Sequence, residues 1–474
     1  MTASQTRATP GAASQASPAG QGSPVRPAGE QSPGLPAAMD ATLLSGEVRV
    51  AIATLGCKVN RADTLRLEES LPSGVKLVPF RQRAELYVIN TCTVTGAADR
   101  ESRQLIARAH RLNPSAPILV TGCLAELRPE ELASRDGVAE VVPNAGKDTL
   151  LERILAFLPG LSSSEGPGWS APSYQYRPRE VMRPPLKIQD GCSGRCTYCT
   201  VWAARGEPRS LPPEEVHRAL ARYGEQGCPE VVLSGIDLGS YGLDLAAPTS
   251  LAALLLEAAA RAPSPMLRLS SLEVHRVDGA LLSALVEARG RLCSHLHLPL
   301  QSGADPVLGR MRRPYDRQTF SARWRAIGEA LPGACLGADV IAGFPGETGA
   351  DHLATLELLE ELAPAYLHVF PFSPRPGTAA ELMGEAVSVG LRRDRAAELR
   401  SLSDRLWLRF RQAQEGRETT GVVYFRRSRD RLTAFTELGF EASLDGPDEL
   451  MGKRVRLLLG PVDEDGMEGR LLLE

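Results

Sequence analysis

The sequence contains no long apolar run and no start typical of a secreted protein. No segment approaches the roughly 18 consecutive apolar residues that indicate a membrane-spanning helix. The N-terminus also lacks a basic stretch followed by an apolar one. A formal net charge of −3 gives no overall signature of polyanion binding, so any nucleic-acid surface has to be local. We therefore expect neither membrane insertion nor secretion.

The nine cysteines are an odd number, and no signal peptide precedes them. This combination argues against a disulfide framework and for a reducing compartment, where clustered thiols more often bind metal or act in catalysis. We therefore expect a cytoplasmic protein.

Large apolar residues are nearly absent from residues 1–45, which are dominated by Ala, Gly, Ser, Pro and Gln. Such a segment cannot bury enough surface to offset the entropy of ordering, so we predict a disordered tail. Residues 159–184 are rich in Pro, Ser and Gly and are predicted to be a linker. Three domains then remain, at 46–158, 185–415 and 416–474.

Three short apolar runs in the first domain each end just before a cysteine. VRVAIATL precedes Cys57, LYVIN precedes Cys92, and PILVTG precedes Cys123. Between the last two runs, AADRESRQLIARAHRLN has apolar residues at helical spacing, which predicts a helix and hence a parallel α/β sheet. Loops at the carboxyl ends of parallel strands meet at one edge, so we expect the three thiols to meet there. The alternative is that each is a small buried residue.

The second domain repeats a strand and helix pattern six times. Its short apolar runs are LKIQ, EVVLSG, LRLSS, HLHLPL, ADVIAG and YLHVF. Six units predict an incomplete, six-stranded version of the parallel α/β barrel, because the complete barrel has eight. Active-site residues of such barrels lie at the carboxyl ends of the strands, and GCSGRCTYC directly follows the first run.

The last part of the chain changes character. Residues 391–418 form a predicted Arg-rich amphipathic helix whose apolar face contains Leu399, Leu402, Leu406 and Phe410. From Thr420, short β-type runs predict a small antiparallel β-barrel. Aromatic and basic residues alternate in its first part: Tyr424, Phe425, Arg426, Arg427, Arg429 and Arg431. This pattern suits phosphate contacts with base stacking, and the alternative is a solvated charged edge.

The three cysteines of GCSGRCTYC are Cys192, Cys196 and Cys199. A zinc clip would normally have two spaced pairs and four ligands, and no fourth cysteine or histidine lies nearby in the sequence. Three thiolates on one loop can instead hold three irons of a four-iron, four-sulfur cluster. The fourth iron is then open and can bind a substrate.

This CxxxCxxC spacing, with an aromatic residue before the last cysteine, resembles the signature of the radical S-adenosylmethionine superfamily. In that superfamily the open iron chelates S-adenosylmethionine, and one electron from the cluster yields a 5′-deoxyadenosyl radical. The resemblance implies that Tyr198 lies near the adenine. DVIAGFPGE follows the fifth strand in this comparison, and the implied cofactor-pocket residues are Gly235, Ser270, Ser271, Gln301, Asp339 and Ile341.

The first domain extends the resemblance. GCKVN, NTCTVT and TGC are similar to motifs of the methylthiotransferase family, in which three cysteines hold a second cluster. The resemblance therefore implies two 4Fe-4S clusters, and makes all six cysteines catalytic metal ligands: Cys57, Cys92, Cys123, Cys192, Cys196 and Cys199. It also implies a C-terminal barrel similar to the RNA-binding TRAM domain.

GCKVN and NTCTVT resemble the branch that acts on N6-threonylcarbamoyladenosine beside the tRNA anticodon, at position 37. This implies conversion to the 2-methylthio derivative, with S-adenosylmethionine as both radical source and methyl donor. The implied partners are tRNA, an electron donor such as a flavodoxin or ferredoxin, and a sulfur donor, without a membrane. Carbon 2 of adenine carries a hydrogen that no side-chain base near pH 7 can remove, so a radical route suits the reaction.

Alternative functions stay open at this point. One is methylthiolation of isopentenyladenosine in tRNA or of a ribosomal-protein aspartate, although GCKVN argues against the aspartate. Another is a non-catalytic zinc or iron–sulfur protein that binds RNA.

Other cysteines, histidines and acids are predicted to be core residues or further contacts to cofactor or substrate. Cys228, Cys293 and Cys335 are predicted core residues; His295 and His297 are predicted buried histidines on one strand face; Asp237 and Glu273 are further candidates for cofactor or substrate contacts.

Overall fold

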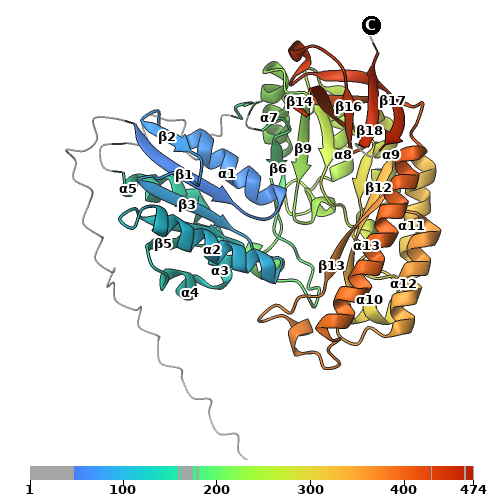
Figure 1. The fold of residues 1–474 in the computed structure, drawn as a ribbon, viewed down its shortest axis with the longest axis horizontal. Helices are drawn as coiled ribbons and strands as arrows, with labels where there is room; N and C mark the ends of the chain where they lie inside the picture. The colour runs from blue at the N-terminus through green and yellow to red at the C-terminus, as the bar shows by residue number, and fades with distance from the viewer. Residues whose placement is uncertain are drawn as a thin grey trace, which may run out of the picture. The chain divides into compact units, whose positions relative to one another are not determined.

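Figure 1 shows the fold of the chain in a computed structural model that describes residues 47–158, 161, 174–177, 179, 181–428, 430–463 and 466–472. The predicted tail, residues 1–45, and most of the predicted linker, residues 159–184, lie outside the described residues. None of the helices in the described ranges combines the length and apolar character needed to cross a bilayer.

The N-terminal part contains a five-stranded parallel sheet in the order β2-β1-β3-β4-β5. Its strands are β1 (Val48–Thr54), β2 (Val75–Val78), β3 (Leu86–Thr91), β4 (Ile118–Gly122) and β5 (Val138–Val142). The three predicted strands are confirmed as β1, β3 and β4. The sequence analysis missed β2 and β5, which form the two edges. Edge strands are less buried and carry polar residues such as Lys76 and Glu140, so their apolar signal is weak.

Helices cover both faces of this sheet. On one face, α1 (Lys58–Ser70) and α5 (Leu150–Ala156) share a hydrophobic core with the strands. On the other face, the helices are α2 (Gly96–Leu112), α3 (Cys123–Leu127) and α4 (Pro129–Ala133). The predicted helix over 97–113 is confirmed as α2, and the side chain of its N-cap, Thr95, accepts a hydrogen bond from the Ala98 amide.

The central part contains six parallel strands in two groups of three. They are β6 (Pro185–Lys187), β9 (Glu230–Ser234), β10 (Met266–Leu269), β11 (His295–His297), β12 (Cys335–Ala342) and β13 (Tyr366–Pro371). The groups are joined where the Leu267 amide donates to the Arg291 carbonyl at 2.8 Å and the Cys293 amide donates to the Leu267 carbonyl at 2.8 Å. In the described structure β6 pairs only with β9 and β13 only with β12, which gives the predicted incomplete barrel.

Helices pack outside these strands, as Figure 1 shows for α11, α12 and α13. The helices are α7 (Pro213–Glu225), α8 (Leu251–Ala260), α9 (Gly279–Glu287), α10 (Asp305–Met311), α11 (Arg317–Ala330), α12 (Gly349–Leu362) and α13 (Val389–Gln412). Three residues of the predicted apolar face of α13, Leu399, Leu402 and Leu406, are buried in the barrel's core. The fourth, Phe410, packs partly buried against the C-terminal core.

The C-terminal part is a closed five-stranded barrel in the order β14-β15-β16-β18-β17. Its strands are β14 (Glu418–Ser428), β15 (Arg431–Thr436), β16 (Glu441–Leu444), β17 (Arg454–Asp463) and β18 (Gly466–Leu471). The predicted small antiparallel barrel is confirmed, with one exception: β16 and β18 run parallel. These two strands are separated in sequence by one strand that reverses the chain, so they point the same way when they close the barrel.

The aromatic and basic segment of this barrel is only partly described. The side chains of Arg426, Arg427 and Arg429 lie outside the described residues. Arg431 forms ion pairs with Asp445 at 3.3 Å and Glu468 at 3.0 Å. The described arginine of the segment is therefore already paired with carboxylates.

Candidate active site with two cysteine triads

The first cysteine triad lies at one edge of the N-terminal sheet. Strands β1, β3 and β4 are neighbours, and their last residues are in register, with Thr54 opposite Asn90 and Asn90 opposite Thr121. The three cysteines follow these strand ends directly: Cys57, Cys92 and Cys123. Cys57 is exposed, whereas Cys92 and Cys123 are buried. The structure thus brings together three thiols that are distant in sequence, as the alternation of strands and helices predicts.

Glycines allow the close approach of these cysteine loops. Gly56 has φ +91°, and a Cβ added there would lie 2.6 Å from Sγ of Cys92. Gly122 has φ +98°, and its added Cβ would lie 2.3 Å from the Thr91 carbonyl oxygen. Both positions therefore require glycine for the backbone conformation and for space.

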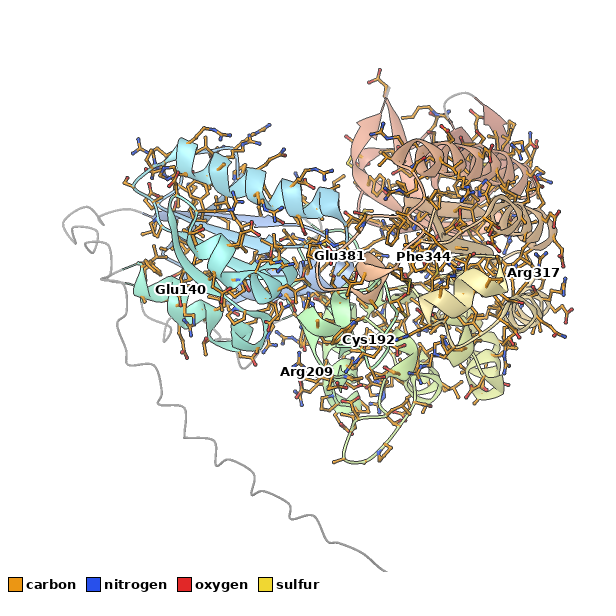
Figure 2. The ribbon with its side chains drawn as sticks, turned by 90° about the horizontal axis from the view of Figure 1, so that it is seen from below. Glu140, Cys192, Arg209, Arg317, Phe344 and Glu381 are labelled. Carbon is orange, nitrogen blue, oxygen red and sulfur yellow. The ribbon has the colours of Figure 1, made fainter. Side chains whose placement is uncertain are left out.

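The second triad lies on the loop between β7 (Gln189–Asp190) and α6 (Val201–Arg205), and Figure 2 labels its first cysteine, Cys192. Gly191 starts the loop with φ +76°, and an added Cβ would come within 2.0 Å of the Glu207 carbonyl oxygen. Backbone amides already point at two of the thiols. The Gly194 amide donates to Sγ of Cys192 at 3.3 Å, and the Val201 amide donates to Sγ of Cys199 at 3.4 Å.

The spacing of the thiols argues against a single bound ion. In the described part of the chain, the one group of three His, Cys, Asp or Glu ligands within 4.8 Å of one another is His297, Asp339 and His368. Neither cysteine triad is gathered that tightly. A tetrahedral zinc site with Zn–S bonds of about 2.3 Å needs sulfurs about 3.8 Å apart. The wider triads suit thiolates that each bind a different iron of one cluster.

Burial favours the protonated form of two of these thiols, Cys92 and Cys199, when no metal is bound. It raises the pKa of Cys92 to about 11, and the nearby thiols Cys123 and Cys57 add to the shift. Burial also raises the pKa of Cys199 to about 12, with further contributions from Cys196 and Cys192. Because thiolates are the metal-binding form, binding of iron has to release protons at neutral pH.

Hydrogen bonds join the segments that carry the two triads. Thr200, which follows Cys199, donates from Oγ1 to the backbone oxygen of Thr93, which follows Cys92, at 3.4 Å. Arg205, at the end of α6, donates from Nε to Sγ of Cys123 at 3.3 Å. The loop after β13 also reaches this edge, because Nη2 of Arg375 donates to Oγ1 of Thr93 at 2.5 Å. The two triads therefore face a common region.

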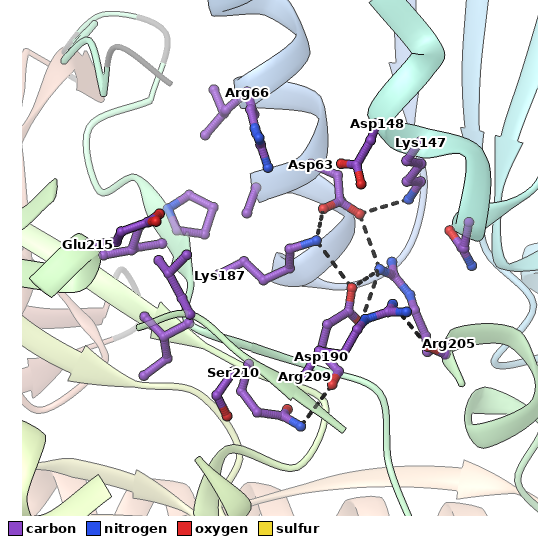
Figure 3. Close-up of a pocket in the computed structure, with 18 of the residues that line it drawn as sticks. Asp63, Arg66, Lys147, Asp148, Lys187, Asp190, Arg205, Arg209, Ser210 and Glu215 are labelled. Carbon is purple, nitrogen blue, oxygen red and sulfur yellow. Dashed lines mark hydrogen bonds and ion pairs between the residues drawn. The ribbon is translucent and has the colours of Figure 1, made fainter. Parts of the chain in front are cut away.

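A buried network of charges lies behind Cys123 and borders a cavity of about 350 Å³ (Figure 3). Asp63 accepts from Nζ of Lys147 at 2.7 Å and from Nη1 of Arg205 at 3.1 Å, and it also accepts from Lys187. Asp190 accepts from Lys187 at 3.1 Å and Arg205 at 3.0 Å. Three cations thus share the two carboxylates of Asp63 and Asp190.

The charges of this network fix one another's ionisation. Burial raises the pKa of Asp63, but the cations of Lys147, Lys187 and Arg205 outweigh this effect and hold it well below its usual range. Asp63 comes from α1, whereas Lys187 and Arg205 come from the barrel, so the network ties the N-terminal sheet to the second cysteine loop (Figure 3).

Two of the residues implied for a cofactor pocket, Tyr198 and Ile341, pack against one apolar cluster. Nη1 of Arg313 lies 3.4 Å from the hydroxyl of Tyr198 and 3.5 Å from Sγ of Cys196. The ring of Tyr198 meets Phe344 edge to face at 6.4 Å between centroids, and Ile341 packs against the same apolar cluster. Tyr198 and Ile341 therefore both contact the apolar cluster that contains Phe344, and Tyr198 belongs to the cysteine loop itself.

The remaining implied pocket residues follow the barrel order. The amide of Gly235 donates to Oγ of Ser270 at 3.3 Å, whereas the neighbouring Ser271 is exposed. Gln301 has φ +71°, and its backbone bonds to the Asp339 carbonyl at 2.8 Å and to the Ile341 amide at 2.9 Å. A positive φ at a residue other than glycine is costly and is often found at functional sites.

DVIAGFPGE is predicted to follow the fifth strand. This is wrong for the first residues of the motif, which still belong to that strand, β12. Asp339 and Ile341 lie within β12, because pairing with β13 continues to Ala342 opposite Pro371. Asp339 accepts from Nε2 of His297 at 2.8 Å and from Nδ1 of His368 at 3.2 Å. These two bonds are the largest causes that lower the pKa of Asp339 to about 2, against burial. Asp339 is thus an ionised acceptor inside the barrel.

The histidines and the two further acids named in the sequence analysis form hydrogen bonds or ion pairs. His295 and His297 both contact the hydroxyl of Tyr366, at 2.8 and 3.1 Å. Asp237 pairs with Arg276 at 3.1 Å, and Glu273 pairs with Arg313. Cys228, Cys293 and Cys335 are buried, in agreement with their interpretation as core residues.

Sequence reasoning missed the charged residues that join the parts of the site: Asp63, Lys147, Asp190, Arg205, Arg313 and Arg375. Arg205 and Arg375 could have been considered, because each lies within a few residues of a quoted motif. Asp63 also lies close to a quoted motif, three residues after GCKVN, whereas Lys147 carries no such signal, since a charged residue normally faces solvent.

Comparison with known proteins agrees with this geometry. The uncharacterized protein family UPF0004 matches residues 49–143, and the Radical SAM superfamily matches residues 186–359. The threonylcarbamoyladenosine tRNA methylthiotransferase MtaB of Bacillus subtilis is 35% identical over 420 residues, 86% of this chain and 93% of that protein. A tRNA-2-methylthio-N(6)-dimethylallyladenosine synthase of Pelobacter propionicus is 30% identical over 440 residues, 89% of this chain and 98% of that protein.

A solved structure shares the fold. The radical S-adenosylmethionine methyltransferase TsrM of Kitasatospora setae, with cobalamin and a [4Fe-4S] cluster bound, matches with a TM-score of 0.53. It is 16% identical, and the match covers 71% of this chain and 77% of that one. The chain therefore belongs to the radical S-adenosylmethionine methylthiotransferase family, in the branch of the threonylcarbamoyladenosine tRNA methylthiotransferases.

Proposed function

We propose that this protein converts N6-threonylcarbamoyladenosine at position 37 of tRNA into its 2-methylthio derivative. The observation that carries the proposal is the juxtaposition of two cysteine triads through Thr200, Thr93 and Arg205. Insertion of sulfur at an unactivated carbon needs a radical source and a sulfur carrier close together. One triad without the other would supply only half of this requirement.

We assign one 4Fe-4S cluster to each triad. Cys192, Cys196 and Cys199 hold the first, and Cys57, Cys92 and Cys123 hold the second. The donor sets fit, because each triad provides three thiols at a spacing too wide for one ion. When bound, the clusters and S-adenosylmethionine supply a 5′-deoxyadenosyl radical, a sulfur atom and a methyl group.

The protein's own residues orient these groups. The amides of Gly194 and Val201 donate to sulfur ligands of the first site, and Arg205 donates to Cys123 at the second. Such bonds stabilise the anionic form of a thiolate. For S-adenosylmethionine we propose a pocket that surrounds Tyr198 and follows the strand ends, formed by Tyr198, Gly235, Ser270, Ser271, Gln301, Asp339 and Ile341.

The choice of substrate follows the relatives. The threonylcarbamoyladenosine enzyme of Bacillus subtilis is more similar to this chain, at 35% identity, than the dimethylallyladenosine enzyme of Pelobacter propionicus, at 30%. Two alternatives have weaker support. The motif GCKVN argues against a ribosomal-protein aspartate, and the thiol spacing argues against a zinc protein that only binds RNA.

The proposed reaction requires other molecules besides this protein. The reaction consumes electrons and sulfur, so we propose a one-electron donor such as a flavodoxin or ferredoxin, and a separate sulfur donor. With tRNA as the substrate, the protein is expected in the cytoplasm, without a membrane partner.

Nucleoside mass spectrometry of tRNA from a deletion strain tests the substrate and the reaction together. We expect the 2-methylthio form of threonylcarbamoyladenosine to disappear and its unmethylthiolated precursor to accumulate, with recovery when the gene is restored. An unchanged level of the methylthio form, in cells that normally make it, would contradict the proposal. Loss of the methylthio form of isopentenyladenosine alone would favour the alternative tRNA substrate.

A further inference from the structure

Three side chains on neighbouring strands of the central barrel meet at one point. They are His297 of β11, Asp339 of β12 and His368 of β13. Asp339 is in register with His368, and His297 is in register with Gly337 of β12. Nε2 of His297 lies 2.8 Å from Oδ1 of Asp339, and Nδ1 of His368 lies 3.2 Å from the same oxygen. One ligand atom from each residue therefore lies within 4.8 Å of the other two.

Two imidazoles and a carboxylate form a ligand set that is typical of transition-metal sites. Imidazole suits zinc, copper, iron and nickel, whereas magnesium and calcium prefer oxygen ligands. In a tetrahedral zinc site, bonds of about 2.0–2.2 Å place neighbouring ligand atoms about 3.3–3.5 Å apart. Oδ1 of Asp339 is already 2.8 and 3.2 Å from the two nitrogens. An ion therefore fits between the three ligand atoms after side-chain movements of less than about 1 Å.

The hydroxyl of Tyr366 holds the other ring nitrogen of His297. Nδ1 of His297 lies 3.1 Å from this hydroxyl oxygen, which in turn lies 2.8 Å from Nε2 of His295. The Nδ1–H of His297 can donate to Tyr366, whose O–H then donates to His295. This arrangement leaves Nε2 of His297 free for a metal ion. Histidines that bind metal almost always donate their other ring N–H in this way.

The group is open to solvent on one side. The side chain of His297 is 7% exposed and that of Asp339 is 20% exposed, whereas that of His368 is 56% exposed. An ion held by these residues is reached from the side of His368, and a water molecule or a ligand group can complete its coordination. Three protein ligands with one open position are typical of catalytic zinc sites.

We propose that His297, Asp339 and His368 bind one zinc ion with an open position, at a site made of residues outside both cysteine triads. Zinc binds nitrogen and oxygen ligands more tightly than manganese or ferrous iron does. Asp339 also belongs to the proposed S-adenosylmethionine pocket, where its carbonyl oxygen accepts from the Gln301 amide at 2.8 Å. The zinc ion therefore lies beside this pocket, and its open position takes an oxygen or nitrogen group.

Zinc binding by the reconstituted holoenzyme tests the site. Untagged protein with its full iron content is dialysed against buffered Zn²⁺, and zinc and iron are counted by mass spectrometry. We expect the wild type to bind one zinc per chain in addition to about eight irons. His368→Ala should weaken zinc binding at least a hundredfold, because loss of a residue behind a ligand already costs about 10- to 100-fold. His368 is exposed, so its replacement should leave the iron content unchanged.

Two further variants complete the experiment. Tyr366→Phe keeps the ring and removes the hydroxyl behind His297, so it should weaken zinc binding about 10- to 100-fold. His352→Gln is the control, because His352 also pairs with a carboxylate, Glu398, at 2.6 Å. In the described part of the chain His352 belongs to no group of three such ligands, and its replacement should not change zinc binding. Iron content equal to that of the wild type verifies that the variants fold.

X-ray absorption at the zinc edge identifies the ligands of the bound ion. We expect nitrogen and oxygen neighbours at about 2.0–2.2 Å and no sulfur at about 2.3 Å. Sulfur neighbours would mean that zinc occupies a cysteine triad, and they would overturn the inference. Failure of the wild type to bind zinc, or equal binding by His368→Ala, would also overturn it. The three side chains would then form a hydrogen-bonded group only.

Discussion

Cys196→Ala is expected to abolish formation of 5′-deoxyadenosine, whereas Cys92→Ala is expected to retain it and to lose methylthiolation of tRNA. Cys196 belongs to the loop triad, with Tyr198 and Arg313 beside it, while Cys92 belongs to the triad of the N-terminal sheet. The two triads are carried by different elements and different hydrophobic cores, so loss of one ligand set should leave the other set intact. The measurement is anaerobic turnover with reductant, followed by mass spectrometry of both products.

Iron content provides the control for this pair of variants. The reconstituted wild type should bind about eight irons, and each variant about four, because a four-iron cluster is lost in each case. Cys228→Ala removes a buried cysteine outside both triads, and it should bind the full amount of iron. Equal loss of both products in both cysteine variants would contradict separate roles for the triads. Tightly bound zinc without cleavage of S-adenosylmethionine would favour the RNA-binding alternative.

Asp63→Asn is expected to destabilise the N-terminal sheet strongly. Asp63 is the acceptor for Lys147, Lys187 and Arg205 (Figure 3). Asp63, Lys147 and Arg205 are buried, whereas Lys187 is partly exposed. The substitution leaves three cations with the single carboxylate of Asp190. Removal of one partner from a buried ion network typically costs about 3–5 kcal/mol. Hydrogen exchange of the β1 and β3 amides should therefore become about a hundredfold faster or more, as each factor of ten corresponds to about 1.4 kcal/mol.

The pH dependence gives this prediction a second check. The pKa of Asp63 is lowered in the folded protein, so its stabilising effect is present above the ordinary aspartate pKa of about 3.9 and is lost as the pH falls below it. The difference between wild type and Asp63→Asn should therefore be largest near neutral pH and shrink under acid conditions. Glu85→Gln is the matched control, because Glu85 pairs with Arg49 at the surface, where ion pairs contribute about 0–1 kcal/mol. Equal exchange rates in Asp63→Asn and Glu85→Gln would contradict a structural role for the network.

Much of the fold can be predicted from the sequence because buried parallel strands have a strong apolar signal. The runs before Cys57, Cys92 and Cys123 are strands with mostly buried residues, and they could be recognised without a partner. Strands β2 and β5 could not, since edge strands are stabilised by pairing on one side and carry polar residues. The parallel pairing of β16 with β18 depends on how the barrel closes, which no local pattern reports.

The candidate site also contains residues that the sequence predicts and residues that it does not. The cysteines could be predicted from spacing and from their positions after strands, because both are properties of the chain itself. Arg205, Arg313 and Asp63 act through distant partners, such as the pair of Arg205 with Asp63, which are 142 residues apart. Their role depends on tertiary contacts alone.

The central claim is that two facing cysteine triads insert sulfur at carbon 2 of threonylcarbamoyladenosine in tRNA. The most direct measurement is a single turnover of the reconstituted protein on a tRNA hairpin whose threonylcarbamoyladenosine carries deuterium at carbon 2. We predict that deuterium appears in 5′-deoxyadenosine and that the same nucleoside gains a methylthio group in place of the deuterium. A 5′-deoxyadenosine free of deuterium, with the nucleoside unchanged, would contradict the account.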